Sequence, residues 1–136
     1  PVLELSQLAF PYLEKTNGTI ISTSSVLAEN PSRLMAAYCM SKAAIEMATN
    51  VLAHELGPKI RVNSVNPGMT NTHLFDDMDP TLFKTFISQT VSNTPLHRLG
   101  EPLDVAKAVA FLASADAQFI TGAHIAVNGG VQWLGL

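Results

Sequence analysis

The segment AAYCMSKAAIEMATNVLAHELGPKIRVNSVNPG, residues 36–68, decides the fold. Its first part, residues 36–56, has the length and apolar content of a long packed helix. Gly57-Pro58 is a common way to end a helix. The residues that follow, 59–66, are typical of a strand, and the Pro-Gly pair at 67–68 indicates a turn. A long helix followed directly by a strand predicts an α/β protein.

The same alternation of helix and strand continues on both sides of this segment. The further expected elements are a helix in residues 1–15, a strand buried on both faces in 19–22, two short helical pieces around Pro80 in 73–93, a helix in 101–114 and a strand followed by a turn in 124–130. This order predicts about three parallel strands joined by right-handed crossovers, the doubly wound α/β class. In such sheets ligands bind at the carboxyl ends of the strands.

Composition narrows the classes of protein to which the chain can belong. Hydrophobic residues make up 47% of the 136 residues and charged residues 14%, a balance typical of a packed globular domain. The net charge is −3, and no run of Lys or Arg is present, so a nucleic-acid partner is not expected. No apolar stretch has the length of a membrane span, so no membrane partner is expected. The single cysteine, Cys39, fits a reducing compartment, and we expect a cytoplasmic location.

Three polar residues form a candidate catalytic group. Tyr38 and Lys42 are four residues apart, so their side chains share one face of the helix. A neighbouring ammonium lowers the pKa of a phenol and lets it act as a general acid or base. Ser25 precedes Tyr38 by thirteen residues, at a strand end, where its hydroxyl could donate to a carbonyl oxygen. Such a site can protonate an alkoxide, but the hydride needs a nicotinamide cofactor.

Together these motifs resemble the short-chain dehydrogenase/reductase family, whose fold is Rossmann-like. GTIISTSSV (18–26) is similar to the family's fifth strand, and YCMSK (38–42) matches its YxxSK motif. The resemblance implies that Ser25, Tyr38 and Lys42 are catalytic: Tyr38 is the acid/base, and Lys42 lowers its pKa and holds the nicotinamide ribose. IRVNSVNPGMTNT (60–72) matches the family's sixth strand and the loop after it. PLHRLGEPLDVAKAVAFLAS (95–114), followed by ITGAHIAVNGG (120–130), is similar to the family's last helix and strand.

The resemblance also implies how cofactor and substrate are held. Pro67 and Gly68 would lie under the nicotinamide, the backbone near Thr70 would bind its carboxamide, and Thr72 would reach a phosphate. The cofactor would be NADP or NAD, with NADP favoured. The substrate, a small carbonyl or alcohol, would contact Ser25 and four apolar residues: Leu27, Met69, Leu74 and Phe75.

Residues 73–86 correspond to the family's mobile lid over the substrate. They are rich in apolar side chains, which suits a carbonyl compound with hydrophobic bulk; alternatively, these side chains simply cover the core. Within the family, YC, ELGPKIRVNSVNP and the Thr after the loop look like carbonyl reductases of the L-xylulose/dicarbonyl type. Two positions depart from the family pattern: Asn128 replaces a common Asp, and Thr70 replaces a commonly apolar residue.

The cofactor half of the family's domain has no counterpart in these residues. The sequence contains no GxxxGxG arrangement, and the family's catalytic Asn would precede Pro1. We therefore expect residues 1–136 to be the C-terminal half of a single Rossmann-type domain. Its partners would be the N-terminal half of the same protein and further copies in a homo-oligomer, commonly a homotetramer in this family.

Other readings of the same residues are weaker. HELGP (54–58) lacks the second His of a HExxH zinc site, and no metal site is predicted. Ser25 lacks the G-x-S-x-G elbow of a serine hydrolase, and Cys39 has no His partner placed for it. A non-catalytic relative that keeps the fold as a binding or assembly module stays open as the alternative to the enzyme.

These residues expressed alone are predicted to aggregate or to unfold without cooperativity. The strand in 19–22 would lack a neighbour on one side, and an unpaired apolar edge is a template for association. Size-exclusion chromatography and thermal denaturation of the 136-residue product test this. A monomer with a sharp melting transition would contradict it.

Overall fold

The computed structural model describes residues 1–30 and 32–131 and confirms the predicted alternation. The main elements are α1 (Val2–Leu13), β1 (Thr19–Thr23), α2 (Ala36–Leu56), β2 (Arg61–Pro67), α3 (Pro80–Asn93), α4 (Pro102–Ala113) and β3 (His124–Val127). Four short 3-10 helices join them: η1 (Glu14–Thr16), η2 (Val26–Ala28), η3 (His73–Phe75) and η4 (Ala115–Ala117). Pro31 lies outside the described residues.

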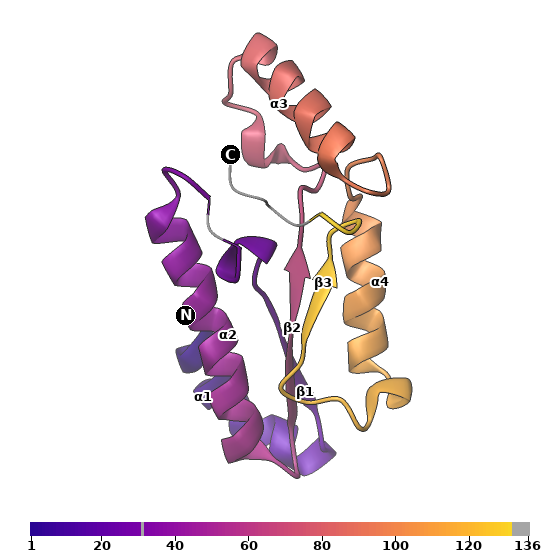
Figure 1. Cartoon of the computed structure of the whole chain (residues 1–136). Helices are drawn as coiled ribbons and strands as arrows, with labels where there is room; N and C mark the ends of the chain where they lie inside the picture. Colours follow the sequence, from indigo (N-terminus) through magenta and orange to yellow (C-terminus); the bar gives the residue numbers. More distant parts are fainter. Residues whose placement is uncertain (31, 132–136) are drawn as a thin grey trace.

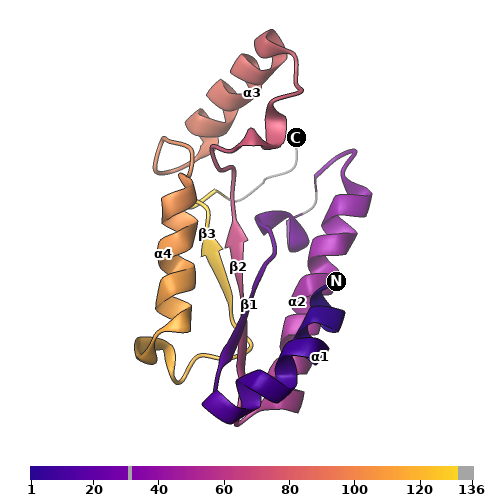
Figure 2. The same cartoon turned by 180° about the vertical axis from the view of Figure 1, so that it is seen from behind.

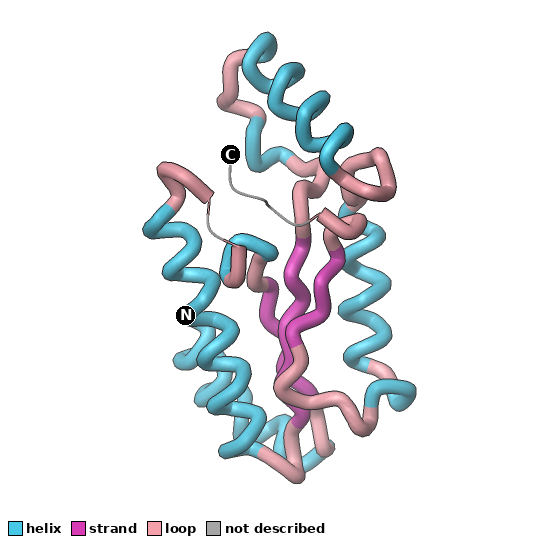
Figure 3. Tube along the Cα trace, in the orientation of Figure 1, coloured by secondary structure: helices cyan, strands magenta, loops and turns pink. Residues whose placement is uncertain are grey.

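The three strands form one parallel sheet in the order β1-β2-β3. Thr19 pairs with Arg61 and Thr23 with Val65, while Ser64 pairs with His124 on the other side of β2. The strands therefore end together, and the loops that follow β1 and β2 leave the sheet at the same end (Figure 3). This is the end at which a parallel α/β sheet binds its ligands.

Helices cover both faces of the sheet, but the two crossovers differ in hand. Helices α1 and α2 lie on one face and α4 on the other (Figures 1 and 2). Both crossovers step in the same direction across the sheet, so the β1-α2-β2 crossover is right-handed, as predicted, whereas β2-α4-β3 is left-handed. The preference for right-handed crossovers comes from a twisted strand that feeds directly into a helix. Residues 68–101 intervene between β2 and α4, which removes that coupling.

Alternation along the strands divides the core into two layers. Val62 faces α1 and α2 and packs with Leu52, Ala53 and Ile60, whereas Val65 faces α4 and packs with Leu112 and Ala117. The partly buried residues around Leu112 are at helical spacing on α4 and include Val105, Ala108 and Val109. Because successive side chains of β2 point to opposite faces of the sheet, this strand packs against both layers of helices.

Strand β1 is less buried than predicted. Its first four residues are only partly buried and Thr23 is exposed, whereas the five central residues of β2 are buried. The reason is the edge position expected from the sequence: within the described residues β1 pairs with β2 alone. An apolar run in the sequence indicates a strand but does not say how many neighbours the strand has.

Local chemistry fixes several helix ends. Asn17 adopts the left-handed conformation after η1 and ends the first helical segment (φ 49°). The Asp79 side chain accepts hydrogen bonds from the N–H groups of Thr81 and Leu82, so α3 begins at Pro80 as one helix of 14 residues. Helix α2 ends at Leu56 as predicted, although Gly57 is extended and not left-handed. None of the described helices combines the length and apolar character that crossing a membrane requires.

Leu112→Ala is predicted to lower the free energy of unfolding by about 2–5 kcal/mol, because it empties a packed site in the core. Leu112 is 0% exposed, whereas Leu103 on the same helix is 61% exposed. Leu103→Ala is therefore the matched control and should change stability far less. Urea denaturation of both variants measures the difference, and equal losses would contradict the placement of the core.

Candidate active site

Tyr38 and Lys42 lie on one face of the first two turns of α2, as their spacing predicts. The Lys42 Nζ is 5.6 Å from the centroid of the Tyr38 ring. The same Nζ donates a hydrogen bond of 3.0 Å to the carbonyl oxygen of Thr23, the last residue of β1. The ammonium therefore connects the tyrosine-bearing turn to the carboxyl end of β1, with two N–H groups left for other acceptors. Both side chains are partly exposed.

Ser25 is buried, lies two residues after the end of β1 and is the N-cap of η2. Its Oγ accepts a hydrogen bond of 3.1 Å from the Leu27 N–H. Because a hydroxyl is both donor and acceptor, this leaves the Ser25 hydrogen free for another acceptor, and the described structure assigns it none. Residues of η2 contact α2, so Ser25, Tyr38 and Lys42 belong to neighbouring elements at one end of the sheet.

A buried carboxylate that sequence reasoning missed lies beneath this end. Glu46, one turn after Lys42, is 8% exposed. Its Oε1 accepts hydrogen bonds from the Ser24 Oγ and from the Asn66 Nδ2. Ser24 also contacts the carbonyl oxygen of Lys42, at 3.1 Å. The signal in the sequence was present: Ser64 and Asn66 alternate on one face of a buried strand, which polar residues do only when they have partners.

The loop after β2 is fixed by close backbone packing. The Gly68 N–H donates to the carbonyl oxygen of Val127, and a Cβ at Gly68 would lie 2.9 Å from the Cβ of Asn128. Only glycine fits this approach. Pro67 ends β2, and Thr70 forms an isolated bridge with Gly100 while its Oγ1 donates to the Gly68 carbonyl oxygen. The Pro67–Thr70 backbone is thus held in place beside the strand ends.

Thr72 and the residues after it extend away from the sheet. Thr72 is exposed and begins η3, where its Oγ1 accepts from the Leu74 N–H. The Phe75 ring lies 6.3 Å from that of Phe83 and 5.9 Å from that of Phe86. Leu74 is 73% exposed, and neither core cluster includes a described residue of 73–86. The segment packs on itself beyond the carboxyl ends of the strands (Figures 1 and 2), which argues against the alternative that it covers the core.

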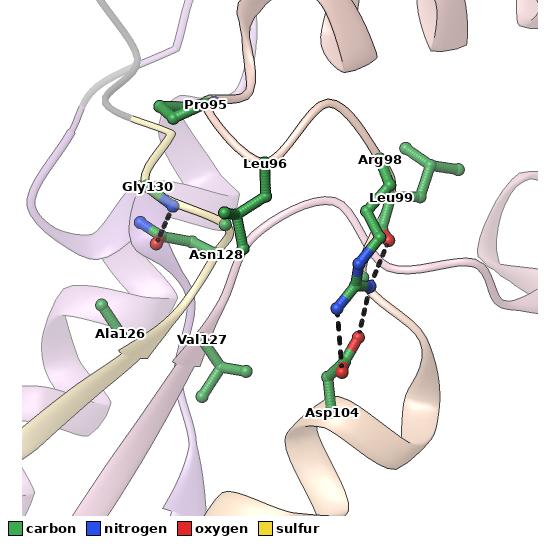
Figure 4. A pocket seen from close by; sticks show the side chains of 11 residues that line it. Pro95, Leu96, Arg98, Leu99, Asp104, Ala126, Val127, Asn128 and Gly130 are labelled. Atoms are coloured by element: carbon green, nitrogen blue, oxygen red, sulfur yellow. Dashed lines mark hydrogen bonds and ion pairs between the residues drawn. The ribbon is translucent and has the colours of Figure 1, made fainter.

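The described surface also has a cavity of about 510 Å³ beside the ends of β2 and β3 (Figure 4). None of the predicted catalytic residues lines it; its walls include Leu96, Leu99, Val127 and Asn128. The Asn128 Oδ1 accepts from the Gly130 N–H, and its Nδ2 donates to the Val131 carbonyl oxygen. The second bond needs an amide donor, which gives a physical reason for Asn where the family commonly has Asp.

One edge of this cavity is an ion pair. Arg98 forms two hydrogen bonds with Asp104, of 2.6 and 3.1 Å, and the Glu101 N–H donates to the same carboxylate. These interactions, the hydrogen bonds from Arg98 first, lower the pKa of Asp104 from 3.8 to about 2. The pair fixes the loop before α4 to the first turn of that helix.

The residues of the chain fit one half of a nicotinamide cofactor. The Lys42 ammonium retains free N–H groups, and the Pro67–Thr70 backbone is held against Asn128 and Gly100 at the strand ends. These groups suit a ribose and a carboxamide. The 136 residues contain no glycine-rich turn for a pyrophosphate, so these groups fit only the nicotinamide side of such a cofactor.

Comparison with known proteins gives consistent matches over nearly the whole chain. A family profile described as enoyl-(acyl carrier protein) reductase matches residues 2–132. The 7alpha-hydroxysteroid dehydrogenase of Escherichia coli K12 is 38% identical over 128 residues, which cover 93% of the chain and 49% of that protein. The human mitochondrial dehydrogenase/reductase SDR family member 2 is 42% identical over 132 residues, covering 95% and 45%.

Solved structures of dehydrogenases also match nearly the whole chain. A 7alpha-hydroxysteroid dehydrogenase in complex with NADH and 7-oxo glycochenodeoxycholic acid superposes with a TM-score of 0.86 at 37% identity, covering 96% of the chain and 51% of that structure. A small-chain dehydrogenase in complex with NADPH gives 0.87 at 33% identity, covering 95% and 57%. The chain spans about half the length of these relatives.

Asp104→Asn is predicted to weaken the folded protein at neutral pH. Because the folded state lowers the pKa of Asp104, its carboxylate stabilises the fold above the ordinary value of 3.8, and this contribution is lost as the pH falls to about 2. The stability difference between wild type and variant should therefore shrink between about pH 4 and pH 2. Denaturant titrations across this range measure it; Asp116→Asn, at the other end of α4, is the control. A difference independent of pH would contradict the assignment.

Proposed function

The chain belongs to the short-chain dehydrogenase/reductase family, and we propose that it supplies the catalytic side of a nicotinamide-dependent oxidoreductase that interconverts a carbonyl and an alcohol. The observation that carries the proposal is the position of Lys42. Its ammonium lies against the Tyr38 ring and donates to Thr23, two residues before Ser25. One cation thus joins the phenol-bearing turn to the strand end that holds the serine.

The three residues have distinct roles in this proposal. A bound nicotinamide supplies or accepts the hydride. The Ser25 hydroxyl, already oriented by the Leu27 N–H, donates to the substrate oxygen and polarises the carbonyl. Tyr38 gives its phenolic proton to the alkoxide oxygen in reduction and takes it back in oxidation. Lys42 holds the ribose with its free N–H groups.

The finer assignments are also proposals. Pro67, Gly68, Thr70 and Thr72 would hold the nicotinamide side of the cofactor, NADP in preference to NAD. The relatives with solved complexes bind NADPH in one case and NADH in another. The substrate would be a small ketone or diketone, as in carbonyl reductases of the L-xylulose/dicarbonyl type. Its apolar part would contact Leu27, Met69, Leu74 and Phe75, because residues 73–86 extend past the strand ends.

We further propose that residues 1–136 act with an N-terminal half and in a homo-oligomer, a tetramer by family resemblance, in the cytoplasm. The length of the relatives and the edge position of β1 support a partner at that edge. Helices α1 and α2 expose several large apolar side chains that suit subunit contacts: Leu3, Leu5, Leu8, Met40 and Met47.

Tyr38→Phe in the full-length protein is predicted to lower kcat by roughly 10²–10⁴-fold, because the substitution removes the proton donor. Cofactor affinity should change little, since the ring and Lys42 remain. The measurement is the oxidation of NADPH or NADH with a panel of ketones and diketones, together with cofactor titration.

Tyr12→Phe is the matched control, because Tyr12 is 72% exposed on α1. It should retain wild-type turnover. If Tyr38→Phe also retains turnover, the oxidoreductase proposal is wrong. If the protein shows no turnover and Tyr38→Phe leaves partner binding unchanged, the binding or assembly module is the better account.

A further inference from the structure

We propose that Glu46 is a positioning residue that holds the Tyr38–Lys42 turn of α2 against the ends of β1 and β2. This inference rests on the proposed function, since Glu46 itself would touch neither substrate nor cofactor. Glu46 is 8% exposed, and the two described hydrogen-bond partners of its carboxylate come from two different strand ends. A buried acid of this kind must be matched by donors from the surrounding structure.

Both donors converge on one atom, Oε1 of Glu46. Ser24 Oγ lies 3.3 Å from Oε1 and 3.1 Å from the carbonyl oxygen of Lys42, so a single hydroxyl faces two acceptors one helical turn apart. Asn66 Nδ2 donates to the same Oε1 from β2. Ser24 and Asn66 are 2% and 4% exposed, so water does not substitute for either contact.

Each segment that forms a hydrogen bond with Glu46 carries a proposed site residue next to the residue that makes this bond. Ser24 precedes Ser25, and Asn66 precedes the Pro67-Gly68 turn. Glu46 follows Lys42 by one turn on the same helix face. One carboxylate therefore sets the mutual position of the serine, the lysine and the nicotinamide loop. Weaker hydrogen bonds to the Glu46 carboxylate would shift these groups relative to one another without removing any of them.

Asn66 is itself held from the other side. Ser64 Oγ lies 3.0 Å from the Asn66 Oδ1 and 2.7 Å from the His124 Nδ1, and the His124 Nε2 lies 3.1 Å from the Asn50 Oδ1. These polar contacts start at Glu46 on α2, pass through Asn66 and Ser64 of β2 and His124 of β3, and return to α2 at Asn50, one turn after Glu46. This closed arrangement fixes the amide of Asn66 with its Nδ2 directed at Glu46.

The test uses the complementary chemistry of the Glu46–Asn66 pair. Asn66→Asp replaces the donor by a second carboxylate facing Glu46, which disfavours the paired position. Glu46→Gln keeps an acceptor and adds a donor. The double variant Glu46→Gln/Asn66→Asp restores an amide–carboxylate hydrogen bond with the two partners exchanged, while the substituted Asp still accepts from Ser64.

In the full-length protein, Asn66→Asp is expected to lower kcat by about tenfold or more, since small displacements of catalytic groups have effects of this size. KM for the ketone should change by less than about threefold, because no binding contact is removed. The double variant should recover kcat to within about threefold of Glu46→Gln alone, which is the signature of a direct coupling.

A second readout does not depend on turnover. Cys39 lies next to Tyr38 and is partly buried, so its rate of alkylation by iodoacetamide, followed by peptide mass spectrometry, reports how firmly this turn is held. The rate should rise in Asn66→Asp and return in the double variant. Thr49→Val is the matched control: it removes a buried hydroxyl of α2 that, among the described residues, bonds only to Ile45 of its own helix. It should destabilise the protein without changing kcat or the alkylation rate of the native state.

The results separate the two proposals. Recovery of both kcat and alkylation rate in the double variant supports the positioning role. A double variant no better than Asn66→Asp overturns it, as does a Thr49→Val variant that lowers kcat equally. If alkylation follows the expected pattern while Tyr38→Phe keeps full turnover, Glu46 still holds the turn, and it is the oxidoreductase assignment that fails.

Discussion

The burial of β2 between two layers of helices is the constraint on which the rest of the structure depends. Its central residues are shielded on both faces, so each backbone group must pair with β1 or β3 and each side chain must match one layer. Val62 and Val65 meet the apolar requirement on opposite faces. Ser64 and Asn66 meet the polar requirement with partners from α2 and β3. The sheet order and the placement of α2 follow from these contacts.

The polar groups of this centre continue into the proposed active site. Parallel strands end at the same edge, so the turns after β1 and β2 bring Ser25 and the Pro67-Gly68 pair to the same edge of the sheet. Helix α2 brings Tyr38 and Lys42 to that edge from one side, and the Lys42 ammonium contacts the Thr23 carbonyl oxygen. Beneath them Glu46 joins helix and strands. The buried hydrogen bonds of Glu46 thus lie beneath Tyr38 and Lys42, the partly exposed residues of the proposed active site.

The segment between β2 and α4 has a different character. It leaves the sheet at the carboxyl end, forms α3 beyond the strands, and returns to start α4 on the opposite face (Figure 1). This detour permits the left-handed second crossover, and it also places α3 beyond the carboxyl ends of the strands (Figure 1). The Arg98–Asp104 pair and the Gly68–Asn128 contact fix the two ends of the detour. No described residue of the detour belongs to either of the two core clusters.

The sequence by itself determined the order of elements, the bounds of α2 and the sharing of one helix face by Tyr38 and Lys42, because these follow from local spacing and from the chemistry of helix ends. It also indicated the site's location, since carboxyl ends of parallel strands meet. Only the tertiary structure decided the hand of the second crossover and the partners of Glu46, Asn66 and His124. Those features depend on which residues, distant in sequence, become neighbours in a low-dielectric interior, and a pattern along one chain does not specify such pairs.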